Sequence, residues 1–261
     1  MKKKSFISLL LITLLLIGTF SACSSSGGGE KTADKDFIKS VGKGLDARWN
    51  IQYAKGDDDE DLPIEDFRKA VQAEYDAVEG YKSASFEDSV LQEKALKYIN
   101  IMNECLENIE YAYAENEEYL KWSDLYDQRT VLIKDFADNY DLKVSDKNKK
   151  YLDELVADGK AAGAQAKQKE AVEGLVKNLE FELVENDYGW KTYEAILDNT
   201  TDYDIISLDL DISLLDSEGV IVKTEYSNVE NVSKGQKAKV EFNTEAEFDR
   251  IEPIINYLEA K

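Results

Sequence analysis

The sequence predicts an α+β protein in which an antiparallel helical bundle over residues 34–180 precedes a small antiparallel β-sandwich over residues 181–261. In the first region apolar residues recur every three or four positions, and Pro63 is its one proline. In the second region apolar residues recur at every second position between short turn sequences. Each region is long enough to form a domain with its own core.

Residues 1–22 have the three-part layout of a secretory signal. Lys2–Lys4 form a cationic start, and an apolar run over 6–17 is followed by small residues that end at Cys23. A membrane-spanning helix needs about 20 apolar residues, so this run is too short to be one. The stretch therefore predicts a signal peptide, and residues 23–33, rich in serine and glycine, predict a flexible tether.

The residues around the expected cleavage point resemble the lipobox of bacterial lipoproteins, in the form Phe20-Ser21-Ala22-Cys23. The resemblance implies that Cys23 becomes the mature N-terminus and carries a diacylglycerol thioether, which makes the lipid bilayer a partner through the acylated Cys23. Two acyl chains are about what stable anchoring requires. The alternative is an ordinary signal peptide with a chance cysteine at its cleavage site.

The helical region divides into five segments, and each segment has one apolar face. The expected helices cover 34–53, 63–81, 85–114, 117–140 and 145–179. Pro63 fits a first turn, and Ser85 with Asp88 has the spacing of a capping box. From Gly159 to Ala166 the last segment contains mainly small residues, so either a neighbour packs closely there or the segment is a solvated connector to the sandwich.

Two features of this region raise the question of ligands. The acidic loop 57–61 is a place to look for a cation, but it lacks the glycine and distal glutamate of a calcium loop, which favours a solvated loop. Tyrosines are also abundant within thirty residues: Tyr111, Tyr113, Tyr119, Tyr126 and Tyr140. They either line a groove for a sugar or peptide or fill the edge of the core with their hydroxyls in water.

The composition excludes several classes of function. The chain has no histidine, which excludes Ser-His-Asp and Cys-His catalysis and histidine-ligated zinc. Cys105 has no disulfide partner once Cys23 is lipidated, and its helical spacing predicts a buried apolar residue rather than a reactive thiol. The net charge of −22, without a dense basic run beyond the leader, excludes nucleic acid as a partner. We expect no cofactor, no metal and no catalytic residues.

The sandwich region contains the clearest strand of the chain, over 206–214, where five apolar residues alternate with serine and aspartate. Turn sequences at 216–219 and 233–236 separate it from alternating stretches at 220–226 and 238–242. Further strands are expected at 193–197 and 251–257. Short strands joined by short turns predict an antiparallel sandwich.

These residues also resemble the FxLYD domain of bacterial surface lipoproteins, through 197–201, Ile212-Ser213-Leu214-Leu215-Asp216 and 219–220. Ile212 and Leu215 replace the Phe and Tyr of the motif, while Leu214 and Asp216 agree with it. The resemblance implies an immunoglobulin-like fold outside the membrane, often in Gram-positive bacteria, and no catalytic residues. Leu214 is expected to point inward, Asp216 to open the turn, and Asn199 to lie at a strand end.

Together these features predict a membrane-anchored extracytoplasmic lipoprotein that acts as a non-enzymatic binding or interaction module for an unknown envelope protein or polymer. A structural spacer or envelope-assembly factor is the first alternative. A hydrolase that uses paired carboxylates is the second, but with 54 acidic residues no particular pair can be singled out. A solute receptor is disfavoured, because such proteins alternate strands and helices.

Overall fold

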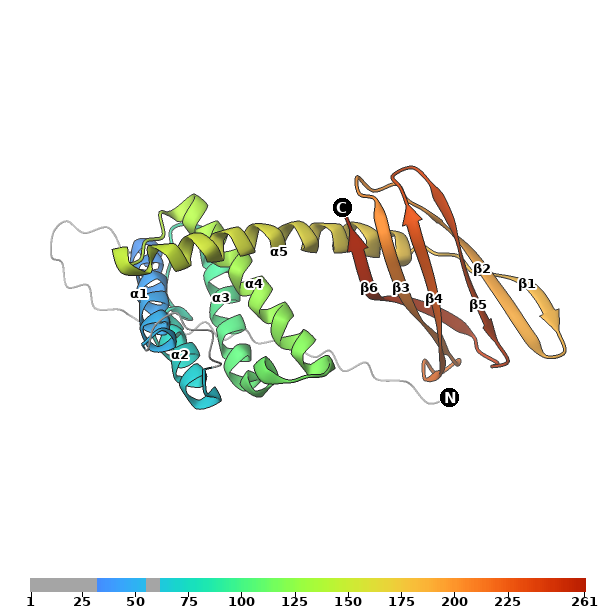
Figure 1. Ribbon diagram of the computed structural model, residues 1–261, viewed down its shortest axis with the longest axis horizontal. Coiled ribbons are helices and arrows are strands. Elements are labelled where there is room, and N and C mark those ends of the chain that lie inside the picture. The colour runs from blue at the N-terminus through green and yellow to red at the C-terminus, as the bar shows by residue number, and fades with distance from the viewer. Residues whose placement is uncertain (1–31, 55–61) are drawn as a thin grey trace, which may run out of the picture. The chain divides into compact units, whose positions relative to one another are not determined.

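A computed structural model describes residues 32–54 and 62–261 and confirms the α+β architecture (Figure 1). Within these residues the α-helices are α1 (Asp34–Gln52), α2 (Ile64–Asp76), α3 (Ser89–Glu107), α4 (Glu117–Tyr140) and α5 (Lys149–Val176). Short 3-10 helices lie in the connections between them, namely η1 (Glu79–Tyr81), η2 (Ile109–Tyr113) and η3 (Asp146–Asn148). The leader, Cys23 and the acidic loop lie outside the described residues, so those expectations stay predictions.

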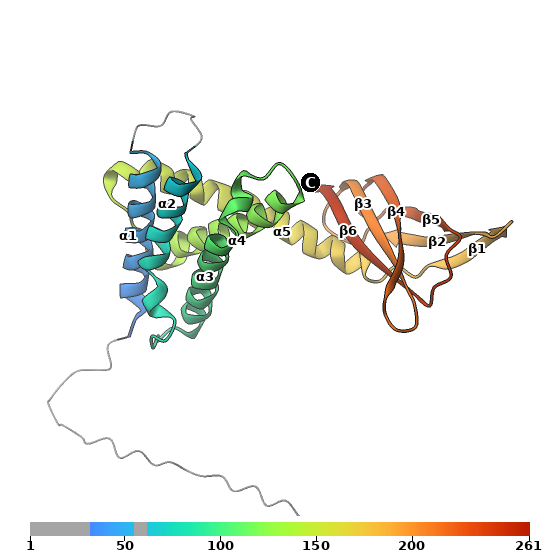
Figure 2. The same ribbon diagram turned by 90° about the horizontal axis from the view of Figure 1, so that it is seen from below.

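The apolar faces expected of the helices meet in one core. Figures 1 and 2 show α1 beside α2 and α3 beside α4. Phe136 of α4 makes edge-to-face contacts with Phe37 of α1 and Tyr98 of α3, with ring centroids 5.6 Å apart in both pairs. Such pairs stabilise a core beyond the area they bury. Cys105 is buried in the same core, as its helical spacing predicts.

The start of α3 and the ends of α2 and α3 differ from the predicted boundaries. Asp88 alone is the N-cap of α3, because its carboxylate accepts hydrogen bonds from the backbone N–H groups of Val90 (2.8 Å) and Leu91 (3.1 Å). The expected capping box with Ser85 is therefore wrong. The second and third helices also end earlier than predicted, at Asp76 and Glu107, because η1 and η2 continue the apolar pattern as short 3-10 turns.

The small residues of α5 allow close packing in one turn and form a solvated connector in others, so both expected alternatives occur. Gly159 lies against the backbone of α4, where an added Cβ would be 2.4 Å from the carbonyl oxygen of Thr130. Residues 164–167, 169 and 170 are exposed to solvent. Val172 and Val176 then pack in the core of the sandwich. The helix therefore contributes residues to both cores, and its middle turns are solvated.

The sandwich consists of two three-stranded antiparallel sheets. The described strands are β1 (Glu182–Asp187), β2 (Trp190–Asp198), β3 (Ile205–Leu215), β4 (Ile221–Val232), β5 (Lys237–Thr244) and β6 (Arg250–Ala260). One sheet has the order β1-β2-β5 and the other the order β4-β3-β6 (Figure 1). Apolar residues of β2 and β5 pack against those of β3 in a shared core. The central strand β3 is the one that the sequence pattern indicates most clearly.

Three residues of the sandwich whose positions we predicted lie where expected. Leu214 is fully buried, and Asp216 opens the turn after β3 by accepting from the N–H groups of Glu218 and Val220 at 2.9 Å. Asn199 follows β2 and is buried, and its amide donates to the carbonyl of Val232 at the end of β4. This hydrogen bond ties one sheet to the other.

The sandwich also departs from the sequence pattern. Ile205, not Ile206, is fully buried, since the pairing of β3 with β6 is irregular between Ile205 and Ser207. The apolar residues at the start of the 220–226 stretch are exposed, and Val229 and Val232 reach the core instead. Strand β1 is missing from the prediction because all six of its residues are exposed and give no alternating pattern.

The close approach of α5 to α4 predicts opposite effects for one substitution at two glycines. Gly159→Ala should lower the free energy of unfolding by about 1–3 kcal/mol, because its methyl group would overlap the Thr130 carbonyl. Gly174→Ala, with nothing within 4 Å of the added Cβ, should instead raise it by about 0.5–1 kcal/mol through helix propensity. Urea unfolding followed by circular dichroism at 222 nm measures both, and equal effects at the two positions would contradict the packing described.

Candidate functional site

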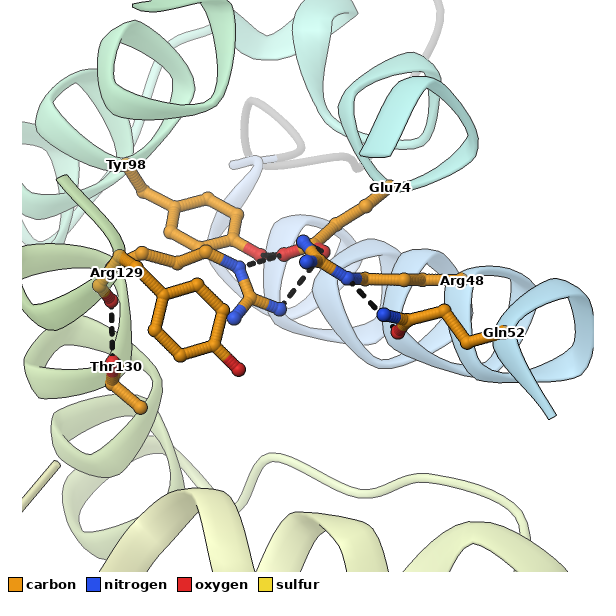
Figure 3. A network of polar contacts seen from close by, with 7 residues as sticks. Arg48, Gln52, Glu74, Tyr98, Arg129 and Thr130 are labelled. Carbon is orange, nitrogen blue, oxygen red and sulfur yellow. Dashed lines mark hydrogen bonds and ion pairs between the residues drawn. The ribbon is translucent and has the colours of Figure 1, made fainter. Parts of the chain in front are cut away.

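A buried charged cluster joins the first four helices. The carboxylate of Glu74 in α2 accepts hydrogen bonds from Arg48 Nη1 of α1 (2.8 Å), from Arg129 Nε (2.7 Å) and Nη2 (2.8 Å) of α4, and from the hydroxyl of Tyr98 in α3 (Figure 3). Arg48 Nε also donates to Gln52 at 3.2 Å. Glu74 is 0% exposed, Arg129 1% and Arg48 3%. The bidentate contact from Arg129 is the strong geometry for a guanidinium and a carboxylate.

The electrostatics of the cluster keep Glu74 charged. Burial raises the pKa of the Glu74 carboxyl, but the attraction of Arg129 and Arg48 and the hydrogen bonds outweigh burial and lower it to about 2. Burial and the neighbouring carboxylate raise the pKa of the Tyr98 hydroxyl well above its usual value, so that hydroxyl stays protonated. Two guanidiniums therefore face a single carboxylate.

Sequence reasoning missed this cluster, although a signal was present. In two of the predicted helices a charged residue fills a gap in the apolar stripe. Glu74 lies between Val71 and Val78, and Arg129 lies between Leu125 and Leu132, at helical spacing. A charge inside an apolar stripe is costly unless it is paired, so the gaps themselves predict buried partners.

An aromatic pocket with a volume of about 340 Å³ opens beside the cluster. The lining residues come from α1, α2, η2 and α4: Arg48, Gln52, Phe67, Ala112, Tyr113, Tyr119, Trp122, Ser123 and Tyr126. The volume lies at the lower end of the range of small-molecule sites. We call this hollow the aromatic pocket.

The walls of the aromatic pocket are held in place by ring contacts. Phe67 of α2 meets Tyr113 and Trp122 edge to face, at centroid distances of 5.7 and 5.6 Å. The guanidinium of Arg48 lies 5.4 Å from the ring centroid of Phe67 and 5.9 Å from that of Tyr126. Aromatic side chains with fixed rotamers present a large contact area at a low entropic cost.

The five tyrosines of the sequence pattern divide between the two expected roles. Tyr113, Tyr119 and Tyr126 line the aromatic pocket. Tyr111 and Tyr140 pack at the edge of the core, and the Tyr140 hydroxyl lies 3.3 Å from a carboxylate oxygen of Asp88. Sequence spacing cannot separate these roles, because both place a tyrosine partly in the core.

Other features of the described residues are weaker candidates for a functional site. A second hollow, on the outer face of the sheet β4-β3-β6, contains Asp209 and Asp211, but the amides of Asn228 and Asn256 already donate to them at 3.2 and 3.0 Å. Burial raises the pKa of Cys105 to about 11, which makes its thiol a poor nucleophile. Residues 32–54 and 62–261 hold no cluster of three or more potential metal ligands.

Within the part of the chain that the structure describes, none of the helices combines the length and the apolarity needed to span a membrane. In the comparisons with known proteins, no family model, curated protein or solved structure matches the chain.

The charge balance of the cluster predicts that Glu74→Gln strongly lowers the stability of the fold. This change leaves two buried guanidiniums without a countercharge, and we expect it to lower the free energy of unfolding by about 3–5 kcal/mol at pH 7. Glu110→Gln is the control, because Glu110 pairs with Arg68 on the surface. It should change stability by less than about 1 kcal/mol in the same urea titration.

The pH dependence provides a second readout of this prediction. Because the pKa of Glu74 is about 2 in the folded chain and 4.5 ordinarily, its stabilisation is complete above pH 4.5 and is lost as the pH falls towards 2. The stability difference between the original chain and Glu74→Gln should therefore shrink over this range. A difference that stays constant from pH 7 to pH 2 would contradict the assigned ionisation of Glu74.

Proposed function

We propose that the chain is a lipid-anchored, extracytoplasmic, non-enzymatic binding protein and that the aromatic pocket is its ligand site. The observation that carries the proposal is a pocket with five aromatic side chains, supplied by separate elements and backed by a buried charged cluster. Aromatic walls with a few placed polar groups are typical of sites for sugars, peptides and small molecules.

The sequence supports the location. The leader over residues 1–22 and the lipobox-like stretch that ends at Cys23 support lipidation of that cysteine and export of the mature chain. The resemblance of the last third of the chain to FxLYD domains supports a position at the bacterial cell surface, in Gram-positive bacteria in particular. A partner in the envelope, either a protein or a polymer, then has direct access to the pocket.

Two features of the described residues favour binding over catalysis. The carboxylate of Glu74 accepts four hydrogen bonds and lies in the core, so it is not free to exchange protons with a substrate. Tyr98 is buried behind it, with a pKa well above the usual range. These two buried groups behind the pocket are therefore poorly suited to transfer protons to or from a ligand.

A spacer is the second candidate function, and one observation favours it. Most residues between 160 and 171 of α5 are exposed, while the two ends of the helix pack in different cores. A spacer does not need the aromatic pocket, so substitutions inside the pocket separate the two functions.

Lipidation predicts that Cys23→Ser abolishes anchoring. The original chain, expressed in a Gram-positive host, should incorporate labelled palmitate and sediment with the membrane, because two acyl chains hold it there. Cys23→Ser should lose the label and leave the membrane fraction, and Cys105→Ser should retain both. Unlabelled original chain, or label that persists in Cys23→Ser, would reject the anchor.

The ligand site predicts a different effect for two neighbouring exposed residues of α4. Tyr119 lines the pocket and is 47% exposed, whereas Leu120 is 66% exposed and does not line it. Tyr119→Ala should weaken binding of the purified chain to isolated cell-envelope material about tenfold, and Leu120→Ala should leave it unchanged. A sedimentation assay measures both, against the leader and tether fused to an unrelated protein.

The assay has two contrary outcomes. If the original chain binds the envelope no better than the anchor-only control, the binding function is wrong. If it binds but Tyr119→Ala binds equally well, the aromatic pocket is not the site, and the spacer becomes the better candidate.

A further inference from the structure

The buried cluster has one positive charge more than its internal pairing requires. Arg129 alone satisfies the Glu74 carboxylate with a bidentate pair, and the Tyr98 hydroxyl donates a further bond to it. Arg48 then adds a second guanidinium at 3% exposure. A buried charge without a countercharge is costly, and the described residues place no second carboxylate in contact with this guanidinium.

One hydrogen-bond donor of the cluster is also unused within the described residues. Arg129 Nη1 is buried and has no hydrogen-bond partner within the described structure. Arg48 donates from Nη1 to Glu74 and from Nε to Gln52, and it lines the aromatic pocket beside this guanidinium. Buried polar nitrogens are normally satisfied, so this unused donor, which lies behind the pocket-lining ring of Tyr126, points to an acceptor from outside the described residues.

Arg48 is the member of the cluster that lines the aromatic pocket. Its guanidinium lies within 6 Å of the ring centroids of Phe67 and Tyr126, both of which also line the pocket. Tyr126 in turn lies 5.4 Å from the guanidinium carbon of Arg129. A ring stacked on these aromatic walls would hold a substituent next to the Arg48 fork.

We propose that the aromatic pocket selects ligands in which a sugar-like ring carries an oxyanion, a carboxylate or a phosphate, and that Arg48 contacts this oxyanion. The guanidinium fork matches both oxyanions, and the aromatic walls accept the ring. The second guanidinium of the cluster then provides a countercharge for the ligand oxyanion. This inference rests on the proposed function, because it assigns the ligand class of the same pocket.

The test compares matched probes on the full chain in a non-ionic detergent. Glucuronate carries a carboxylate and glucose 6-phosphate a phosphate, while glucose has the same ring without either group. Each is titrated to 100 mM at constant ionic strength, and apparent dissociation constants are taken from the shift in Tm. At least one charged sugar should bind about tenfold tighter than glucose or better, and the stronger of the two identifies the oxyanion.

Substitutions at Arg48 test whether its guanidinium causes the preference for charged sugars. Arg48→Met keeps an apolar stem and leaves Glu74 paired with Arg129, and it should remove the preference for charged sugars. If Arg48→Met does not fold, Arg48→Lys keeps the charge but lacks the fork, and it should bind the charged probes about tenfold more weakly. Leu120→Ala, outside the pocket, should bind all three sugars like the original chain.

Three results would overturn the inference: charged and neutral sugars bind equally, the charge preference survives at full strength in both Arg48 variants, or neither charged sugar gives a saturable shift. Its failure can be distinguished from failure of the proposed function. If the chain still binds envelope material through Tyr119 while the charge preference is absent, the pocket remains the ligand site and only the oxyanion is wrong.

Discussion

The helical domain depends on one buried carboxylate. Glu74 accepts hydrogen bonds from residues of α1, α3 and α4, so that four helices meet at two oxygen atoms (Figure 3). Apolar contacts tolerate small shifts between helices, whereas charge-assisted hydrogen bonds have narrow distances and angles. The cluster therefore specifies the relative rotation of the helices more sharply than the surrounding core does. Because both arginines are nearly inaccessible to water, loss of Glu74 leaves two buried guanidiniums without their countercharge.

The same cluster shapes the aromatic pocket. Arg48 belongs to both, and Tyr126 contacts both guanidiniums while forming part of the pocket wall. The position of the pocket thus follows from the packing of the helices around Glu74. This arrangement accounts for a site that is rigid at its base, where groups are buried, and more exposed at its rim, where Tyr119 lies. A rigid base holds the polar group that orients a ligand, and an exposed rim admits it.

The sandwich is organised by a different constraint, the burial of one central strand. Strand β3 pairs with β4 and β6, and its inner face packs on the opposite sheet. Val172 and Val176 of α5 enter the same core, so the last turns of that helix belong to the sandwich as much as to the bundle. Asn199 adds a polar tie between the sheets by donating to the carbonyls of Tyr203 and Val232. Buried amides of this kind favour one arrangement of strands because alternatives leave them unsatisfied.

Much of the fold could be predicted from local patterns. Period and composition are local properties, so the five helices, the strand over 205–215 and the two turns with Gly219 and Gly235 follow from neighbouring residues alone. Strand β1 does not, because an edge strand with every residue exposed has no alternation to detect. Its two-residue turn has positive φ at Tyr188 and Gly189, and Gly189 is the residue type in the sequence that favours such a turn.

Part of the candidate site could likewise be predicted from the sequence, and part could not. The abundance of tyrosine, the absence of histidine and the count of only two cysteines are visible in the chain, and these features alone narrow the possible chemistry. Which tyrosines line a pocket, and which charged residues meet at Glu74, depends on contacts between residues 24 to 55 positions apart. Gaps in the apolar stripes indicate that Glu74 and Arg129 are buried and paired, but they do not say with which residues, because each helix satisfies its own pattern whatever its partner is. Tertiary packing alone decided that Arg48 should stand between the buried carboxylate and the aromatic wall.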